Sequence, residues 1–105
     1  MNEHRIVLVT CPDRDAAVKI GSALVEEKLA ACANLVEGVT SIYRWKNEIH
    51  QDAEALLLVK TRAALFADVE RRVLELHPYE VPEIIACDIA AGNLPYLNWI
   101  DESTT

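Results

Sequence analysis

The stretch C-A-N-L-V-E-G-V-T-S-I-Y-R-W at Cys32–Trp45 is the strongest structural signal in this chain. Near its end, aromatic rings fall on every second residue, and a period of two is typical of a β-strand. A second apolar stretch follows at residues 49–61, after the polar connection at residues 46–48. We therefore expect two long strands joined as a hairpin. Gly38 indicates a bulge or a bend in the first arm.

Strand and helix signals alternate on both sides of this hairpin. Residues 5–10, R-I-V-L-V-T, form a continuous apolar run that predicts a central strand covered on both faces. Residues 13–28 place small and branched apolar side chains on one face, which predicts a helix. After the hairpin, we expect Thr61 to cap a second helix over residues 62–76, which Pro78 ends.

The remaining elements complete a known topology. Residues 84–89 predict the last main strand, and Asn93-Leu94-Pro95 opens a short C-terminal helix. The order is therefore β-α-β-β-α-β with a small helix at the end. Two right-handed βαβ crossovers sharing one antiparallel sheet predict a ferredoxin-like α+β fold. With 105 residues and no linker, we expect a single domain over residues 1–105.

The predicted hairpin is longer than the body that carries it. Strands of about 13 residues reach about 43 Å, whereas a domain of this size is about 30 Å wide. The arm carries Ile42, Tyr43 and Trp45, which are costly to leave in water. We therefore expect a closed oligomer that covers the arm. The alternative is a monomer in which the strands bend at Gly38 or are shorter than they look.

Composition and charge exclude several classes of protein. Apolar residues make up 51% of the chain and charged residues 26%, with a net charge of −7. Such a charge disfavours binding to nucleic acids. The longest apolar run, residues 55–59, is too short to span a membrane. Residues 1–5 lack the layout of a signal peptide, so we expect a cytoplasmic protein.

Three cysteines, odd in number and far apart, fit a reducing compartment. Cys32 could be a thiolate ligand of Cu(I). Its position in the sequence, far from the other cysteines, instead favours a small buried residue where the first helix meets the sheet. Cys11 precedes the first helix, where a thiolate can be stabilised, yet packing is again the favoured interpretation. Cys87 lies in a strand and is expected to pack.

The segment H-P-Y-E-V-P-E at residues 77–83 is the other candidate site. Its two prolines make the connection rigid, so that His77 and Glu83 could converge there on a metal or a small ligand. The alternative, favoured by the residues alone, is a stiff turn between helix and strand. Trp45 and Tyr79 could stack on a ligand or pack at a seam between subunits.

Several longer segments carry a resemblance to a known family. They keep the family's order and spacing from about residue 6 to residue 100, and they read E-K-L-A-A-C-A-N-L (27–35), T-S-I-Y-R-W (40–45), V-K-T (59–61), H-P-Y-E-V-P-E-I (77–84) and Y-L-N-W-I (96–100). Together they resemble the CutA family, the divalent-cation tolerance proteins. The resemblance implies a ferredoxin-like fold similar to that of the PII signal proteins. It also implies a tight homotrimer joined through strands of neighbouring subunits.

The resemblance further implies a role in tolerance of copper and other divalent metals, with no enzymatic activity. The family's characteristic positions fall on Cys32, Trp45, His77, Tyr79 and Glu83 in this sequence. The metal site predicted from them is Cys32, His77 and Glu83. Some members carry a thiol at the position that matches residue 9, which is a valine here and cannot bind metal.

Three hypotheses about function follow from these observations. The first is a non-enzymatic, homotrimeric CutA-like protein that binds copper or another divalent metal weakly. The second is a PII-like sensor that binds a small ligand in clefts between subunits, by analogy of fold alone. The absence of a Gly-rich phosphate loop from the sequence counts against a nucleotide as that ligand. A small hydrolase is a third alternative, but no nucleophile–base pair supports it.

Overall fold

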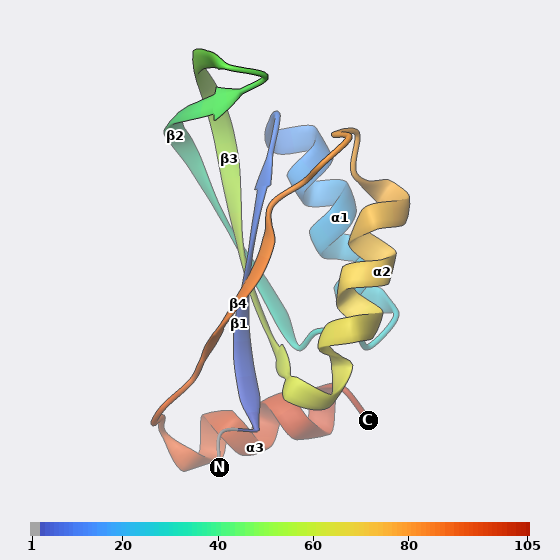
Figure 1. Cartoon of the computed structure of the whole chain (residues 1–105). Helices are drawn as coiled ribbons and strands as arrows, with labels where there is room; N and C mark the ends of the chain where they lie inside the picture. Colours follow the sequence, from blue (N-terminus) through green and yellow to red (C-terminus); the bar gives the residue numbers. More distant parts are fainter. Residues whose placement is uncertain (1–2) are drawn as a thin grey trace.

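The β2–β3 hairpin is the longest feature of the computed structural model, which describes residues 3–105 (Figure 1). Strand β2 (Cys32–Trp45) has 14 residues and strand β3 (Glu48–Arg62) has 15. Lys46 and Asn47 join them with positive φ angles of 51° and 66°. A two-residue turn of this kind matches the right-handed twist of the strands. The predicted hairpin is confirmed.

All four strands belong to one antiparallel sheet, in the order β2-β3-β1-β4. Strand β1 (His4–Cys11) lies between β3 and β4 (Ile84–Asp88). Helix α1 (Arg14–Glu26) connects β1 to β2, helix α2 (Phe66–Leu76) connects β3 to β4, and helix α3 (Leu94–Ser103) follows. The ferredoxin-like α+β fold with an extended hairpin and a C-terminal helix is therefore confirmed (Figure 1).

Helix α1 lies within the predicted segment 13–28, and local contacts fix both of its ends. Asp13 is its N-cap, and the carboxylate accepts a hydrogen bond from the backbone N–H of Ala16 at 2.8 Å. Just after the helix, Lys28 adopts a φ of 61°. The N–H of Leu29 then donates to the carbonyl of Leu24 at 2.9 Å. This left-handed turn sends the chain back toward the sheet.

The start of the second helix differs from the prediction. Strand β3 continues to Arg62, a 3₁₀ helix covers Ala63–Leu65, and α2 begins only at Phe66. Thr61 does not cap a helix. Strand alternation points it into the protein, where it is fully buried and its hydroxyl donates to the carbonyl of Leu29 at 2.6 Å. A buried hydroxyl needs such a partner, and this one ties β3 to the segment after α1.

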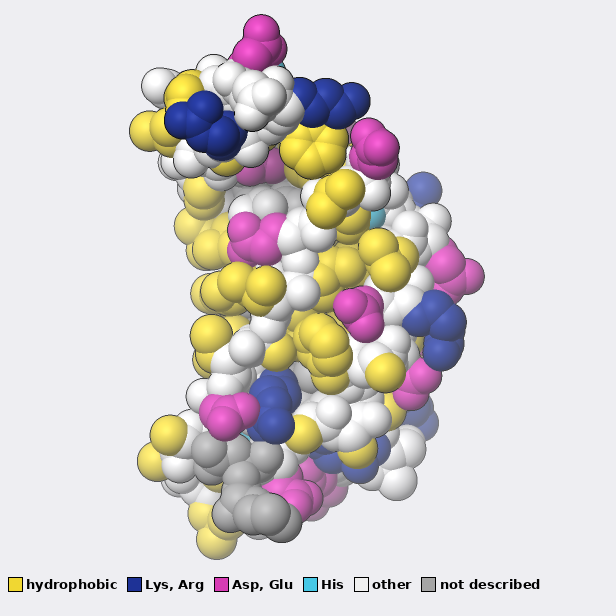
Figure 2. Space-filling model, viewed as in Figure 1, with side chains coloured by type: hydrophobic (Ala, Val, Ile, Leu, Met, Phe, Trp, Pro, Cys, Tyr) yellow, Lys and Arg dark blue, Asp and Glu magenta, His cyan; other side chains and the backbone are white. Residues whose placement is uncertain are grey.

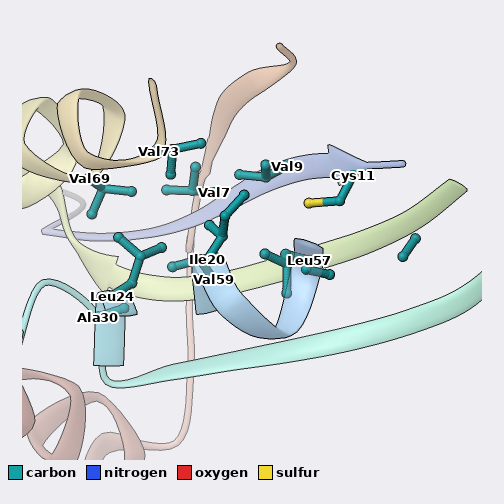
Figure 3. Close-up of a cluster of buried hydrophobic side chains, with 12 residues drawn as sticks. Val7, Val9, Cys11, Ile20, Leu24, Ala30, Leu57, Val59, Val69 and Val73 are labelled. Carbon is teal, nitrogen blue, oxygen red and sulfur yellow. The ribbon is translucent and has the colours of Figure 1, made fainter. Parts of the chain in front are cut away.

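The hydrophobic core lies between the sheet and helices α1 and α2 (Figure 3). Side chains from β1 and β3 point toward these helices, and none of the core residues is more than 2% exposed. The fully buried residues that Figure 3 labels are Val7, Val9, Cys11, Ile20, Leu24, Ala30, Leu57, Val59, Val69 and Val73. The core therefore uses one face of the sheet only.

The other face of the sheet is not covered by α1 or α2, so the prediction that β1 is covered on both faces is wrong within one chain. Along β1, buried residues alternate with the half-buried Ile6, Leu8 and Thr10. Ile85 on the neighbouring β4 is 53% exposed. In Figure 2 hydrophobic side chains gather along the left edge of the molecule, on the side of the sheet away from these two helices. We call this surface the open face.

The molecule is much longer than it is wide, with extents of 44 × 25 × 23 Å. The arms neither fold back over their own sheet nor stop short, so the structure opposes the predicted alternative of a bent or shorter hairpin. Gly38 does mark a bulge, with a φ of 77° and a register shift between Val36 and Val39. Near the tip, Ile42 is 69% and Ile49 62% exposed.

We expect Leu57→Ala to lower the free energy of unfolding by about 2–5 kcal/mol, because it removes a side chain that is 1% exposed and leaves a cavity. The matched control is Leu74→Ala on the outer surface of α2, where the leucine is 54% exposed. It should change stability by less than about 0.5 kcal/mol. Guanidinium denaturation followed by circular dichroism measures both, and equal effects would contradict this placement of the core.

Candidate functional site

A cleft of about 640 Å³ lies between the upper half of the hairpin and the segment 78–83 that leads into β4. Thr10, near the end of β1, contributes to its floor. Figure 2 shows hydrophobic and acidic side chains interspersed on this side of the molecule, beneath the hairpin tip. The lining residues come from the end of β1, from both hairpin arms and from the Pro-rich segment, so the fold itself forms the cleft.

Two tyrosine–carboxylate hydrogen bonds fix the walls of this cleft. The hydroxyl of Tyr79 donates to Oε2 of Glu54 at 2.6 Å and so ties the 78–83 segment to β3. The hydroxyl of Tyr43 donates to Asp52, one step further along the hairpin. The ring of Tyr43 also stacks on His50, with 5.4 Å between the ring centroids. These contacts hold the aromatic rings in place.

His77 supports the cleft from beneath, and both of its ring nitrogens are in use. Nε2 lies 2.7 Å from the carbonyl oxygen of Thr10, which can only accept, so Nε2 carries the proton. Nδ1 accepts the backbone N–H of Tyr79 at 3.1 Å. The imidazole is 8% exposed. A buried ring with both nitrogens occupied holds the segment rigid, and it has no free lone pair for a metal.

The carboxylates give the cleft a negative potential. Burial, followed by the hydrogen bond to Glu54 and the charges around it, raises the pKa of Tyr79 well above its ordinary value. Burial, and after it the charges of Glu54 and Asp13, raises the pKa of the Cys11 thiol to about 11. Cys11 is therefore a protonated, fully buried thiol, which opposes the reactive-thiolate alternative and supports packing.

The structure does not bring the three predicted metal ligands together within one chain. Cys32 pairs with Lys60, which pairs with Ile6, whereas His77 contacts Thr10 four residues further along β1. Four strand residues span about 13 Å. In residues 3–105, no three His, Cys, Asp or Glu side chains lie close enough to hold a metal ion. The set Cys32, His77 and Glu83 thus does not fit a metal ion within one chain.

The other candidate residues differ in how far they are exposed. Glu83 is exposed and lines the cleft. Cys32 is half-buried, with its thiol 3.7 Å from Oδ1 of Asn34. Cys87, which was expected to pack, is exposed on β4 in one chain. The sequence analysis did not identify Glu54 as a candidate. No local pattern indicates it, because Glu54 and Tyr79 are 25 residues apart and meet only in the folded chain.

Comparison with known proteins decides the family. The family model described as CutA1 divalent ion tolerance protein matches residues 5–103. The chain belongs to the CutA1 divalent ion tolerance protein family. It is 54% identical over 101 residues to the divalent-cation tolerance protein CutA of Thermus thermophilus, covering 96% of this chain and 98% of that protein. It spans about half, 54%, of the length of the mammalian CutA proteins that it also matches.

Solved CutA structures share the fold. The divalent cation tolerance protein from Thermus thermophilus superposes with a TM-score of 0.95 at 53% identity, covering 97% of this chain and 99% of that one. A structure described as the periplasmic divalent cation tolerance protein CutA from Archaeoglobus fulgidus gives 0.95 at 36% identity, with coverages of 97% and 99%. Relatives are named for more than one compartment, because the CutA proteins of Oryza sativa and Arabidopsis thaliana, each 43% identical over 99 residues, are described as chloroplastic.

None of the helices in residues 3–105 has the length and apolar character that a membrane span needs. Met1 and Asn2, part of the N-terminal stretch considered for a signal peptide, lie outside the described residues.

We expect His77→Ala to lower the free energy of unfolding by about 1–3 kcal/mol, because it leaves the Thr10 carbonyl and the Tyr79 N–H without their partners. His77→Gln should recover part of this loss, since its amide can still donate to Thr10. Denaturant titrations of the two variants test this. If His77→Ala were as stable as the unmodified protein, the imidazole would not hold the segment.

Proposed function

We propose that this CutA family member is a non-enzymatic homotrimer that supports tolerance of copper or other divalent metals and binds such a metal weakly. The observation that carries the proposal is the family match over residues 5–103, which covers almost the whole chain. The family is named for tolerance of divalent ions, and the names of its relatives describe no reaction.

The homotrimer is supported by the surfaces that one chain leaves uncovered. The open face of the sheet and the outer half of the hairpin both expose apolar side chains, including Ile42, Ile49 and Ile85. Leaving such residues in water costs roughly 1.5–3 kcal/mol each. A second and a third copy would cover them. The number three follows from the resemblance to the family and not from the shape of one chain.

The environments of His77, Cys32 and Glu83 support weak and not tight binding of a metal. His77 would have to give up a buried hydrogen bond to coordinate a metal. Cys32 lies on β2 opposite Lys60, whereas Glu83 lies just before β4 and lines the cleft at the other end of β1. A site that used both would therefore draw on more than one subunit. The thiolate of Cys32 would select Cu(I), whereas Glu83 would suit harder divalent ions.

A PII-like sensor of small ligands is the second candidate function. The cleft of about 640 Å³ below the hairpin tip favours it, because this volume suits an organic ligand better than a single ion. In either case we propose a cytoplasmic protein. The net charge of −7 supports a protein that does not bind nucleic acids.

We expect light scattering at micromolar concentration to give a mass of about 35 kDa, three times the 11.7 kDa of the chain. Trp45→Asp should give smaller particles, because it places a charge in a seam between subunits. The control is Leu74→Asp, which alters an exposed apolar residue on α2 and should leave the mass unchanged. A mass of 11.7 kDa for the unmodified protein would end the trimer proposal.

We expect calorimetric titration of the reduced protein with Cu(I) to show weak binding that Cys32→Ala abolishes, because a thiolate is the preferred ligand of this ion. His77→Gln should weaken binding if His77 is a ligand. Cys87→Ala is the matched control and should bind normally. Binding that neither Cys32→Ala nor His77→Gln alters would exclude the predicted site.

A further inference from the structure

Two cysteines lie on the two opposite edges of the sheet. In the order β2-β3-β1-β4, Cys32 belongs to the edge strand β2 and Cys87 to the edge strand β4. Cys32 is half-buried, and Cys87 is exposed in one chain. Free cysteine is among the residue types that proteins bury most often. An exposed thiol on a sheet edge therefore fits a surface that another copy of the chain covers.

The register of the strands places both thiols at one level and on one face. Cys32 lies opposite Lys60, and Lys60 lies opposite Ile6. Ile6 in turn lies opposite Cys87. Residues directly opposite each other point to the same face of a sheet. Because the next residue of β1, Val7, points into the core, Ile6 and both thiols point to the open face.

The two thiols of one chain cannot reach each other. Strands β3 and β1 lie between them, and the three steps from strand to strand span about 14 Å. A disulfide joins Cα atoms that are usually roughly 4.4–6.8 Å apart. A disulfide between Cys32 and Cys87 would therefore have to join two copies of the chain.

A ring of three copies brings the two edges together. Within residues 3–105, β2 and β4 each have a neighbouring strand on one side only, so a further strand can pair there. Contact between two identical edges is self-complementary and joins only two copies. A ring of three needs two different edges, so β2 of one copy pairs with β4 of the next. These strands run in opposite directions in one sheet, and the pairing continues the antiparallel pattern.

Symmetry sets the level at which the two edges meet. Three copies cover their open faces together when these faces turn toward a common axis that runs along the strands. Rotation about this axis leaves the height of every residue unchanged. Cys32 and Cys87, which share a level in one chain, then face each other across the seam between copies. Opposite residues of antiparallel strands have Cβ atoms about 4.5–5.5 Å apart, close to the separation that a disulfide needs.

We propose that Cys32 of one copy and Cys87 of the next form a reversible disulfide across each seam of the homotrimer. The inference rests on the proposed homotrimer, and it adds a regulation of the proposed metal binding. A thiolate is the ligand that Cu(I) prefers, and the disulfide removes the thiolate of Cys32. Oxidation therefore locks the ring covalently and stops the binding of Cu(I), and reduction restores both states.

The oxidant is a small disulfide such as oxidised glutathione. The thiolate of Cys87 attacks one of its sulfurs, forms a mixed disulfide and releases one glutathione thiolate. The thiolate of Cys32 then attacks the Cys87 sulfur and releases the second glutathione thiolate. The two protons of the protein thiols pass to the released thiolates, and two electrons move from the protein to glutathione. Cys87 is exposed in a single chain, so the first attack can precede closure of the seam.

The test is a non-reducing denaturing gel of protein that is reassembled from guanidinium with oxidised glutathione. Each copy carries one Cys32 and one Cys87, so the three seams should close into a covalent trimer of three times 11.7 kDa. Dithiothreitol should return this band to single chains. Products that stop at covalent dimers, or an absence of cross-linked product, would overturn the proposal.

Single variants identify the two sulfurs. Cys32→Ala and Cys87→Ala should each abolish the cross-link. The control is Cys11→Ala, which removes the third cysteine from the core and should leave the covalent trimer unchanged. Light scattering under reducing conditions checks that each variant still assembles. Cross-linking that persists in Cys32→Ala or in Cys87→Ala would contradict the assigned pair.

A mixture of the two single variants tests the head-to-tail arrangement. A seam can then close only where Cys32 of a Cys87→Ala chain meets Cys87 of a Cys32→Ala chain. A ring of three contains at most one such seam. The mixture should therefore give covalent dimers and no covalent trimer. A covalent trimer from the mixture, or no dimer, would overturn the proposal.

Two further measurements separate this inference from the proposed function. The cross-linked protein should lose the Cu(I) binding of the reduced protein and regain it after reduction, and retained binding would overturn the regulation. A reduced protein that is trimeric by light scattering but never cross-links would contradict this inference and leave the homotrimer standing. A reduced monomer would contradict both. A cross-linked trimer whose reduced form binds no Cu(I) would contradict only the proposed metal binding.

Discussion

The antiparallel pairing of β2 with β3 is the constraint on which the rest of the structure depends. It runs from Cys32 opposite Lys60 to Trp45 opposite Glu48, with one bulge on the way. Because side chains alternate with a period of two, this register decides which face each residue reaches. Leu57 and Val59 enter the core, while Glu54 and Asp52 point to the cleft side with their tyrosine partners.

The same pairing leaves one chain incomplete. A sheet with helices α1 and α2 on one face can bury only that face, and the hairpin extends beyond these helices along a 44 Å axis. The apolar residues on the open face and near the tip could therefore be covered only by contacts from outside the chain, as in the proposed homotrimer. The exposed apolar surface is thus the strongest structural argument for an oligomer, and this argument does not depend on a catalytic site.

The Pro-rich segment, residues 77–83, has a structural role, and its side chains do not form a set of metal ligands. His77 uses both ring nitrogens to join Thr10 to the backbone of Tyr79. Tyr79 in turn reaches Glu54 across the cleft. The result is a rigid wall with an aromatic surface and a negative potential. His77 and Tyr79 therefore have a structural explanation that is independent of metal binding.

Local patterns in the sequence determined the elements and their order: the hairpin, the Asp13 cap, the bulge at Gly38 and the C-terminal helix all follow from neighbouring residues. Tertiary structure alone decided the site. Thr61 bonds to Leu29 instead of capping a helix, and His77 meets Thr10 from 67 residues away. Periodicity reports the face on which a residue lies, but the partner it meets there depends on how distant segments pack. For that reason the sequence could name His77 and Tyr79 as candidates, and only the fold could show which of their atoms remain free.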